Sequence, residues 1–135
     1  MHPCLLVIGF VYPEPTSSAA GTRMLQLITA FQEQGYSVTF ATTCNKSDKA
    51  FDLESIGVKV EAIELNASSF DEFIKTINPT IVLFDRFMTE EQFGWRVAEH
   101  CPDALRILDT EDLHFLRKAR QKALTTNQPL DSFLF

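Results

Sequence analysis

Cys4-Leu5-Leu6-Val7-Ile8-Gly9-Phe10-Val11-Tyr12 is an all-apolar stretch near the start of the chain, and it decides the fold. A strand without polar alternation must be covered on both faces, as the strands of parallel sheets are. Residues 13–23 are rich in Pro and small side chains, and a helical pattern covers 21–34. A second apolar strand follows at 37–42. This order predicts a right-handed parallel crossover, the first unit of a doubly wound sheet.

The rest of the chain continues the alternation of strand and helix patterns. The helix over 21–34 is predicted from the three-and-four spacing of its apolar residues, and Gly35 is expected to end it. Further strands are predicted at 58–65, 80–84 and 105–108, and a short helix at most at 51–56. Ser68 or Ser69 is expected to cap a helix that runs to about Ile77, and a last helix is predicted at 113–124. A capping box, Thr89-Glu-Glu-Gln, predicts the start of another helix.

These elements predict the α/β class: a single Rossmann-like doubly wound parallel sheet of about five strands, with helices on both faces. The expected strand order is 3-2-1-4-5, which makes the first and fourth strands neighbours. The core is predicted to include residues from four of the strands, namely Leu6, Ile8, Val38, Phe40, Ile81, Leu83, Ile107 and Leu108.

Length and composition limit the function. A chain of 135 residues suits one domain, which we place at 1–125; the apolar end of 126–135 predicts a segment that leads to a second domain beyond this sequence. A net charge of −6 argues against nucleic acid as a partner. No apolar run predicts a transmembrane segment and the first residues do not resemble a signal peptide, so we expect a cytoplasmic protein. The three cysteines fit neither a disulfide framework nor a metal site.

Several nucleotide and hydrolase motifs are missing. The turn after the first strand contains a single glycine, Gly21, and therefore neither a dinucleotide fingerprint nor a P-loop. The acidic residues of a receiver domain and the Gly-x-Ser-x-Gly elbow of a hydrolase are also missing. No cofactor and no metal are predicted.

Three segments are expected to meet at the carboxyl edge of the sheet, beside its topological switch: 13–22, Asp85-Arg86 and 109–114. Gly21, Thr22 and Arg23 open the first helix there. Arg23 lies in a helical first turn, where a cation opposes the helix dipole, so it is either a ligand-binding residue or an exposed or salt-bridged arginine.

The last predicted helix offers candidates with two interpretations each. Asp109, Glu111 and Asp112 precede it, either as substrate-binding groups or as carboxylates that cap its N-terminus. His114 shares a face with Arg117, and a neutral His in a first helical turn suits hydrogen bonding to a sugar hydroxyl. A structural or merely exposed His114 is the alternative.

The sequence resembles a known family. The string Leu105-Arg-Ile-Leu-Asp-Thr-Glu-Asp-Leu-His-Phe-Leu-Arg117, the Pro/small/Gly/Arg loop after the first strand and Gly35-Tyr36-Ser37-Val38 are similar to the N-terminal domain of bacterial GT-B glycosyltransferases of the family-four kind. The resemblance implies that Gly21 approaches the donor diphosphate and that His114, as a catalytic residue, contacts the transferred sugar. Ala20 stands where many members have a second glycine.

The resemblance also implies the function. We expect the acceptor-side half of a nucleotide-sugar-dependent glycosyltransferase, inactive without a C-terminal donor-binding domain, with a sugar acceptor as its other partner and the nucleotide sugar as donor substrate. Catalysis would rest on electrostatic stabilisation of the departing nucleoside diphosphate and on positioning of the acceptor. A non-catalytic α/β binding module and a subunit of a two-chain transferase remain as alternatives.

Overall fold

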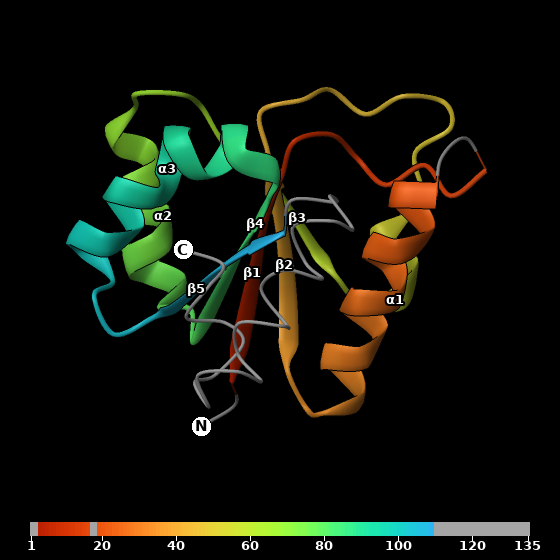
Figure 1. The fold of residues 1–135 in the computed structure, drawn as a ribbon, viewed down its shortest axis with the longest axis horizontal. Helices are drawn as coiled ribbons and strands as arrows, with labels where there is room; N and C mark the ends of the chain where they lie inside the picture. The colour runs from red at the N-terminus through yellow and green to blue at the C-terminus, as the bar shows by residue number, and fades with distance from the viewer. Residues whose placement is uncertain (1–2, 17–18, 110–135) are drawn as a thin grey trace, which may run out of the picture.

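A computed structural model describes residues 3–16 and 19–109, and within these ranges the fold is α/β. Five parallel strands form one sheet in the order β3-β2-β1-β4-β5, as the alternation of patterns predicts (Figure 1). The strands are β1 (Cys4–Gly9), β2 (Ser37–Thr42), β3 (Lys59–Ala62), β4 (Ile81–Asp85) and β5 (Leu105–Asp109). The helices are α1 (Ala19–Glu33), α2 (Ser68–Ile77), α3 (Arg86–His100) and the 3₁₀ helix η1 (Leu53–Ile56).

The described helices cover both faces of the sheet. Figure 1 shows α1 on one side and α2 with α3 on the other. Side chains of β1 alternate between the two layers: Leu5 and Val7 pack in the cluster that contains Met24 of α1, whereas Leu6 and Ile8 pack with Phe93 of α3. These four side chains of β1 are fully buried, which explains why the strand has no polar alternation.

Seven of the eight predicted core residues are buried, and one is not. Leu83, for example, is 4% exposed in the layer beneath α1. Ile107 is only half-buried, because β5 pairs with β4 alone among the described strands and lies at the edge of the sheet. The prediction that β5 is a fully covered strand was therefore wrong for this residue.

Some element boundaries differ from the prediction. The first strand ends at Gly9 rather than Tyr12, because the Phe10 amide donates to the Asp85 carboxylate instead of continuing the ladder. Helix α3 begins at Arg86, so the capping-box prediction was wrong. The Thr89 hydroxyl is buried inside the helix, where it donates to the Asp85 carbonyl oxygen at 2.9 Å.

Other boundaries agree more closely. Strand β2 has the predicted bounds, and Gly57 ends η1 in a left-handed conformation. Helix α2 ends at Ile77 as predicted. It begins at Ser68 with Ala67 at its N-cap position, so the predicted serine cap was wrong. The helix predicted at 113–124 lies outside the described residues. No helix within 3–16 and 19–109 is long and apolar enough to cross a membrane.

Candidate functional site

The candidate site lies at the carboxyl edge of the sheet, where β1 and β4 are neighbours. This is the topological switch point of the sheet, because the helix after β1 (α1) covers one face and the helix after β4 (α3) covers the other (Figure 1). In doubly wound sheets this switch point is where ligands bind. The site is formed by the loop 10–16, the first turns of α1 and α3, and the last residues of β4 and β5.

Two buried carboxylates form the floor of this edge. Asp85 and Asp109 are register partners at the ends of β4 and β5, and they are only 3% and 8% exposed. One oxygen of Asp85 accepts a hydrogen bond from the Phe10 amide at 3.2 Å. Since that amide is the first beyond β1, Asp85 sets the direction in which the following loop leaves the sheet.

Arg23 is the partner of Asp109. Its Nη1 donates to the Asp109 carboxylate at 2.7 Å, and the ion pair joins α1 to the end of β5. The Arg23 side chain is 33% exposed, whereas that of Asp109 is 7% exposed. Arg23 is thus salt-bridged, as one of its two interpretations expects, and the ion pair explains how a cation is tolerated in the first turns of α1.

Arg86 has an unusual backbone conformation. Its φ of +76° lies in the left-handed region, which a long side chain rarely adopts and which costs about 1–3 kcal/mol. The guanidinium carbon lies 4.9 Å from the centre of the Phe10 ring, and Nε lies 3.7 Å from the Asp85 carboxylate. The side chain therefore turns back over the ends of β1 and β4.

Loop 10–16 is held in place by contacts with neighbouring segments. The Pro13 carbonyl accepts a hydrogen bond from the Phe51 amide at 2.9 Å, and the Glu14 carboxylate accepts one from the Ser47 hydroxyl. Loop and helix α1 touch at Gly21, where a Cβ atom would lie 2.6 Å from the Glu14 backbone nitrogen. The missing side chain of Gly21 thus makes room for the protein's own loop.

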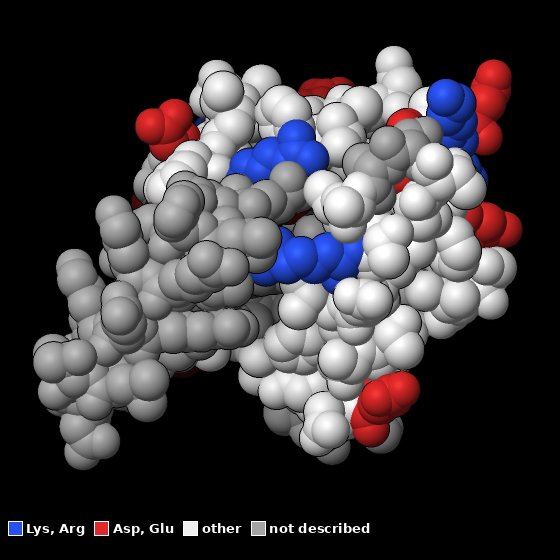
Figure 2. Space-filling model, turned by 45° about the vertical axis from the view of Figure 1, so that its right-hand side comes forward, with Lys and Arg blue, Asp and Glu red and all other residues white. Residues whose placement is uncertain are grey.

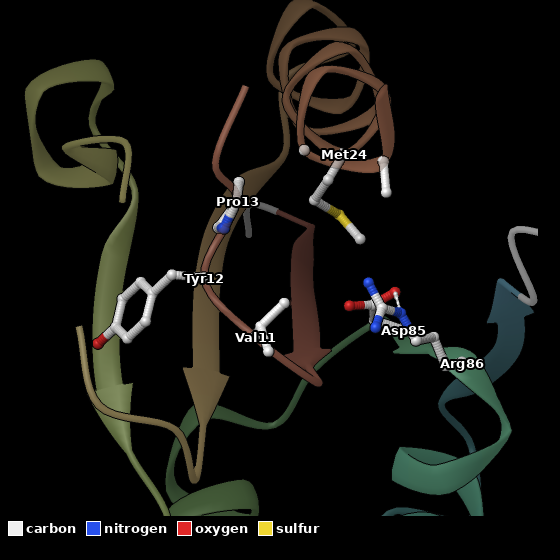
Figure 3. A pocket seen from close by; sticks show the side chains of 8 residues that line it. Val11, Tyr12, Pro13, Met24, Asp85 and Arg86 are labelled. Carbon is white, nitrogen blue, oxygen red and sulfur yellow. Dashed lines mark ion pairs between the residues drawn. The ribbon is translucent and has the colours of Figure 1, made fainter. Parts of the chain in front are cut away.

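A small cavity lies between the loop, α1 and β4. Its volume is about 20 Å³, enough for one water molecule, and its lining includes Gly21, Met24, Asp85 and Arg86. Figure 3 shows the Met24 side chain reaching from α1 toward the Asp85–Arg86 pair. Tyr12 turns away from this cavity and packs against the Phe40 ring at 5.6 Å between ring centres.

The structure brings together five of the predicted site residues: Gly21, Asp85 and Arg86 at the cavity, and the ion-paired Arg23 and Asp109 at the same edge. Thr22 lies elsewhere. Its hydroxyl is 3.4 Å from the Pro15 carbonyl, and it lines a shallow hollow on the exposed side of α1. The remaining four predicted residues lie outside the described residues, namely Glu111, Asp112, His114 and Arg117.

Sequence reasoning missed Phe10. This residue lay inside the predicted first strand, where it would have been buried, but it is 40% exposed and supports the Arg86 guanidinium. The cation–π contact depends on the first strand ending at Gly9, three residues before its predicted end, which no local pattern indicated.

Within the described part of the chain, no three His, Cys, Asp or Glu side chains lie close enough together to hold a metal ion. Comparison of the sequence with protein-family models and with curated proteins finds no match. The site geometry and the resemblance of the motifs are therefore the basis for a functional proposal.

Proposed function

We propose that this chain is the acceptor-side half of a nucleotide-sugar-dependent glycosyltransferase built from two facing Rossmann-like domains. The observation that carries the proposal is the clustering of the Arg23–Asp109 and Asp85–Arg86 pairs at the switch point, beside a loop that is fixed by its neighbours. The similarity of residues 105–117 to family-four GT-B enzymes supports the same assignment.

The two arginines suit recognition of a polyhydroxylated acceptor. Guanidinium groups donate hydrogen bonds to hydroxyls, and the side chains of Arg23 and Arg86 are 33% and 32% exposed at this edge, whereas the carboxylates that position them are buried. A loop and two helix ends that are already fixed would orient an acceptor with little loss of entropy on binding. The donor nucleotide sugar would be bound by a further domain. This half would add contacts to the substrates from Gly21, Glu111, Asp112, His114 and Arg117.

The test is a transfer assay on the product of the complete coding sequence. A second Rossmann-like half after Phe135 and transfer from a nucleotide sugar would support the proposal. The 135-residue chain alone is expected to show no transfer, because the proposed reaction needs two facing domains and these residues supply the acceptor-side one. Turnover of any nucleotide sugar by this chain, or micromolar affinity for a uridine or guanosine diphosphate sugar in calorimetry, would contradict the acceptor-side assignment.

The small volume of the cavity favours a second candidate, a non-catalytic interaction module that encloses no small molecule. Small-molecule sites enclose about 300–1,000 Å³, whereas the cavity at the switch point encloses about 20 Å³. A stop codon directly after Phe135, together with no saccharide binding by the chain, would favour this candidate or a subunit of a two-chain transferase.

A further inference from the structure

Helix α3 carries a stripe of four exposed side chains on the side that faces away from the sheet. Met88, Glu91, Trp95 and Glu99 follow one another at intervals of three, four and four residues, which places them on one face of the helix. All four are exposed, Met88 at 48% and Trp95 at 53%. Phe93, on the opposite face, is 1% exposed and packs in the core. We call the four exposed residues the α3 stripe.

The indole of Trp95 is held in position by a contact with α2. The Arg96 guanidinium carbon lies 4.6 Å from the centre of the Trp95 ring, and Nη1 of the same arginine donates to the Asp71 carboxylate of α2 at 2.7 Å. The side chains of Arg96 and Asp71 are only 12% and 16% exposed. An exposed tryptophan that is fixed in advance loses little conformational entropy when a partner covers it, and tryptophan is enriched among the residues that dominate protein interfaces.

The charge of the stripe is negative. Within the described part of the chain, no ion pair joins Glu91 or Glu99 to another residue, whereas the neighbouring Arg96 is paired with Asp71. The chain as a whole has a net charge of −6, and Figure 2 shows acidic side chains mostly toward the margins of the face that it draws. Such a charge distribution attracts cationic partners and repels anionic ones.

A second copy of the chain fits the stripe poorly. A two-fold axis at Trp95 would bring Glu91 of one copy opposite Glu99 of the other, because these carboxylates lie four residues on either side of the indole. Like charges that face one another across an interface oppose association. The same sign of charge disfavours a surface of anionic lipids and disfavours nucleic acid. The stripe therefore suits a partner that is both apolar and positively charged.

We infer that the α3 stripe is a docking surface for a cationic amphipathic helix of a partner protein. Apolar side chains of that helix would cover Met88 and Trp95, and its lysine or arginine side chains would pair with Glu91 and Glu99. Trp95 lies nine residues beyond Arg86, and so about 14 Å along the helix from the carboxyl edge of the sheet. The docking surface is therefore separate from the candidate site and does not depend on the proposed function.

The test uses the fluorescence of Trp95, which is the only tryptophan in the sequence. The probes are synthetic peptides of about 14 residues, long enough to form a helix on binding: an amphipathic Leu/Lys peptide, its Leu/Glu counterpart, and a Leu/Lys peptide of scrambled order. We expect the amphipathic Leu/Lys peptide to shift the Trp95 emission to shorter wavelength and to protect the indole from acrylamide, and the other two peptides to do neither. The affinity should fall as ionic strength rises.

Charge reversal separates docking from folding. Glu91→Lys together with Glu99→Lys changes exposed side chains only and leaves the indole in place, so it should exchange the preference: the Leu/Glu peptide binds and the Leu/Lys peptide does not. Trp95→Ala, measured by calorimetry, should weaken binding of the Leu/Lys peptide by about tenfold or more, because the central aromatic contact is lost. Leu65→Ala, a residue that is 46% exposed between β3 and α2, is the matched control and should leave the affinity unchanged.

Several results would overturn the inference. The amphipathic Leu/Lys peptide could leave the Trp95 emission unchanged, the scrambled or the Leu/Glu peptide could bind equally well, or charge reversal could fail to exchange the preference. Emission typical of a buried indole in the free chain, insensitive to acrylamide, would show that another segment of this chain or a second copy already covers the stripe, and it too would overturn the inference.

Discussion

The Arg23 guanidinium donates to the Asp109 carboxylate at 2.7 Å and so joins two residues that are 86 positions apart in the chain. The contact ties helix α1 to the end of β5, across the carboxyl edge of the sheet. Arg23 and Asp109 were each predicted as substrate-binding residues, and the structure shows them paired with one another. Their first role is therefore to fix the edge on which a ligand would bind.

Substitution of either residue of the Arg23–Asp109 pair should lower the free energy of unfolding, and the two substitutions should differ in size. Arg23→Gln removes the cation from a carboxylate whose side chain is only 7% exposed, so we expect a loss of about 1–3 kcal/mol in the free energy of unfolding. Asp109→Asn leaves an arginine that is 33% exposed and can be hydrated, and it should cost less. Urea unfolding of both variants and the double variant gives the coupling energy, and a value near zero would show that the pair does not stabilise the fold.

Gly21 should not tolerate a side chain. Gly21→Ala would place a Cβ atom 2.6 Å from the Glu14 backbone nitrogen, and because backbone cannot move aside freely, we expect a loss of about 1–3 kcal/mol. Gly94→Ala in α3 is the control, since its Cβ would meet the end of the flexible Glu90 side chain. Alanine is favoured over glycine in helices, so Gly94→Ala should be neutral or stabilising. Equal thermal stability of the two variants would contradict the packing role of Gly21.

The buried strand β4 should be sensitive to truncation. Leu83 is 4% exposed in the cluster beneath α1, so Leu83→Ala should cost about 2–5 kcal/mol. Ile107→Ala should cost less, because Ile107 is half-buried on the edge strand β5. Chemical denaturation measures both changes. A loss below about 1 kcal/mol for Leu83→Ala would mean that β4 contributes little to the core.

The three thiols should react in order of exposure. Burial raises the pKa of the Cys101 thiol, and burial likewise raises the pKa of the half-buried Cys4 despite opposing effects of Ser37 and Lys59. Cys44 is exposed. At pH 8 we expect iodoacetamide to modify Cys44 first, as peptide mapping by mass spectrometry would show. Faster labelling of Cys101 would mean that the end of α3 opens readily.

The raised thiol pKa values also predict a pH dependence of stability. The folded state favours the neutral thiols of Cys4 and Cys101, so their contribution is present below the unfolded pKa of about 8.5. That contribution is lost as pH rises through the folded pKa. The denaturation midpoint should therefore fall as the pH rises from about 8.5 toward the folded pKa values of the thiols. Cys101→Ala should show a smaller fall than the unsubstituted chain.

We expect His114 to be the catalytic residue of the proposed transferase. In the product of the complete coding sequence, His114→Ala should lower transfer while leaving the melting temperature nearly unchanged, because its predicted face is shared with Arg117 rather than with core residues. Activity assays and thermal melting on the same preparation test this. A markedly lower melting temperature with the activity per folded molecule retained would assign His114 a structural role.

Much of the fold follows from local patterns. The unbroken apolar stretch at 4–9 requires cover on both faces, and Gly35 and Gly57, both with positive φ, mark chain reversals that a side chain would strain. Strand β2 has the bounds that its residues predict. The resulting order of strands and helices determines the sheet topology, because a parallel strand pair joined by a helix has essentially one allowed handedness.

Tertiary contacts decided what the local patterns could not. Phe10 leaves the sheet because Asp85, 75 positions away, accepts its amide hydrogen bond, and Thr89 lies within α3 because its hydroxyl has the Asp85 carbonyl as a partner. Local propensity says nothing of such partners, since they are brought together only when β1 and β4 become neighbours. The Arg23–Asp109 pair and the strained Arg86 arise in the same way. The sequence by itself determined which edge of the sheet carries the candidate site, and the packing of distant segments determined which side chains meet there and how their charges are paired.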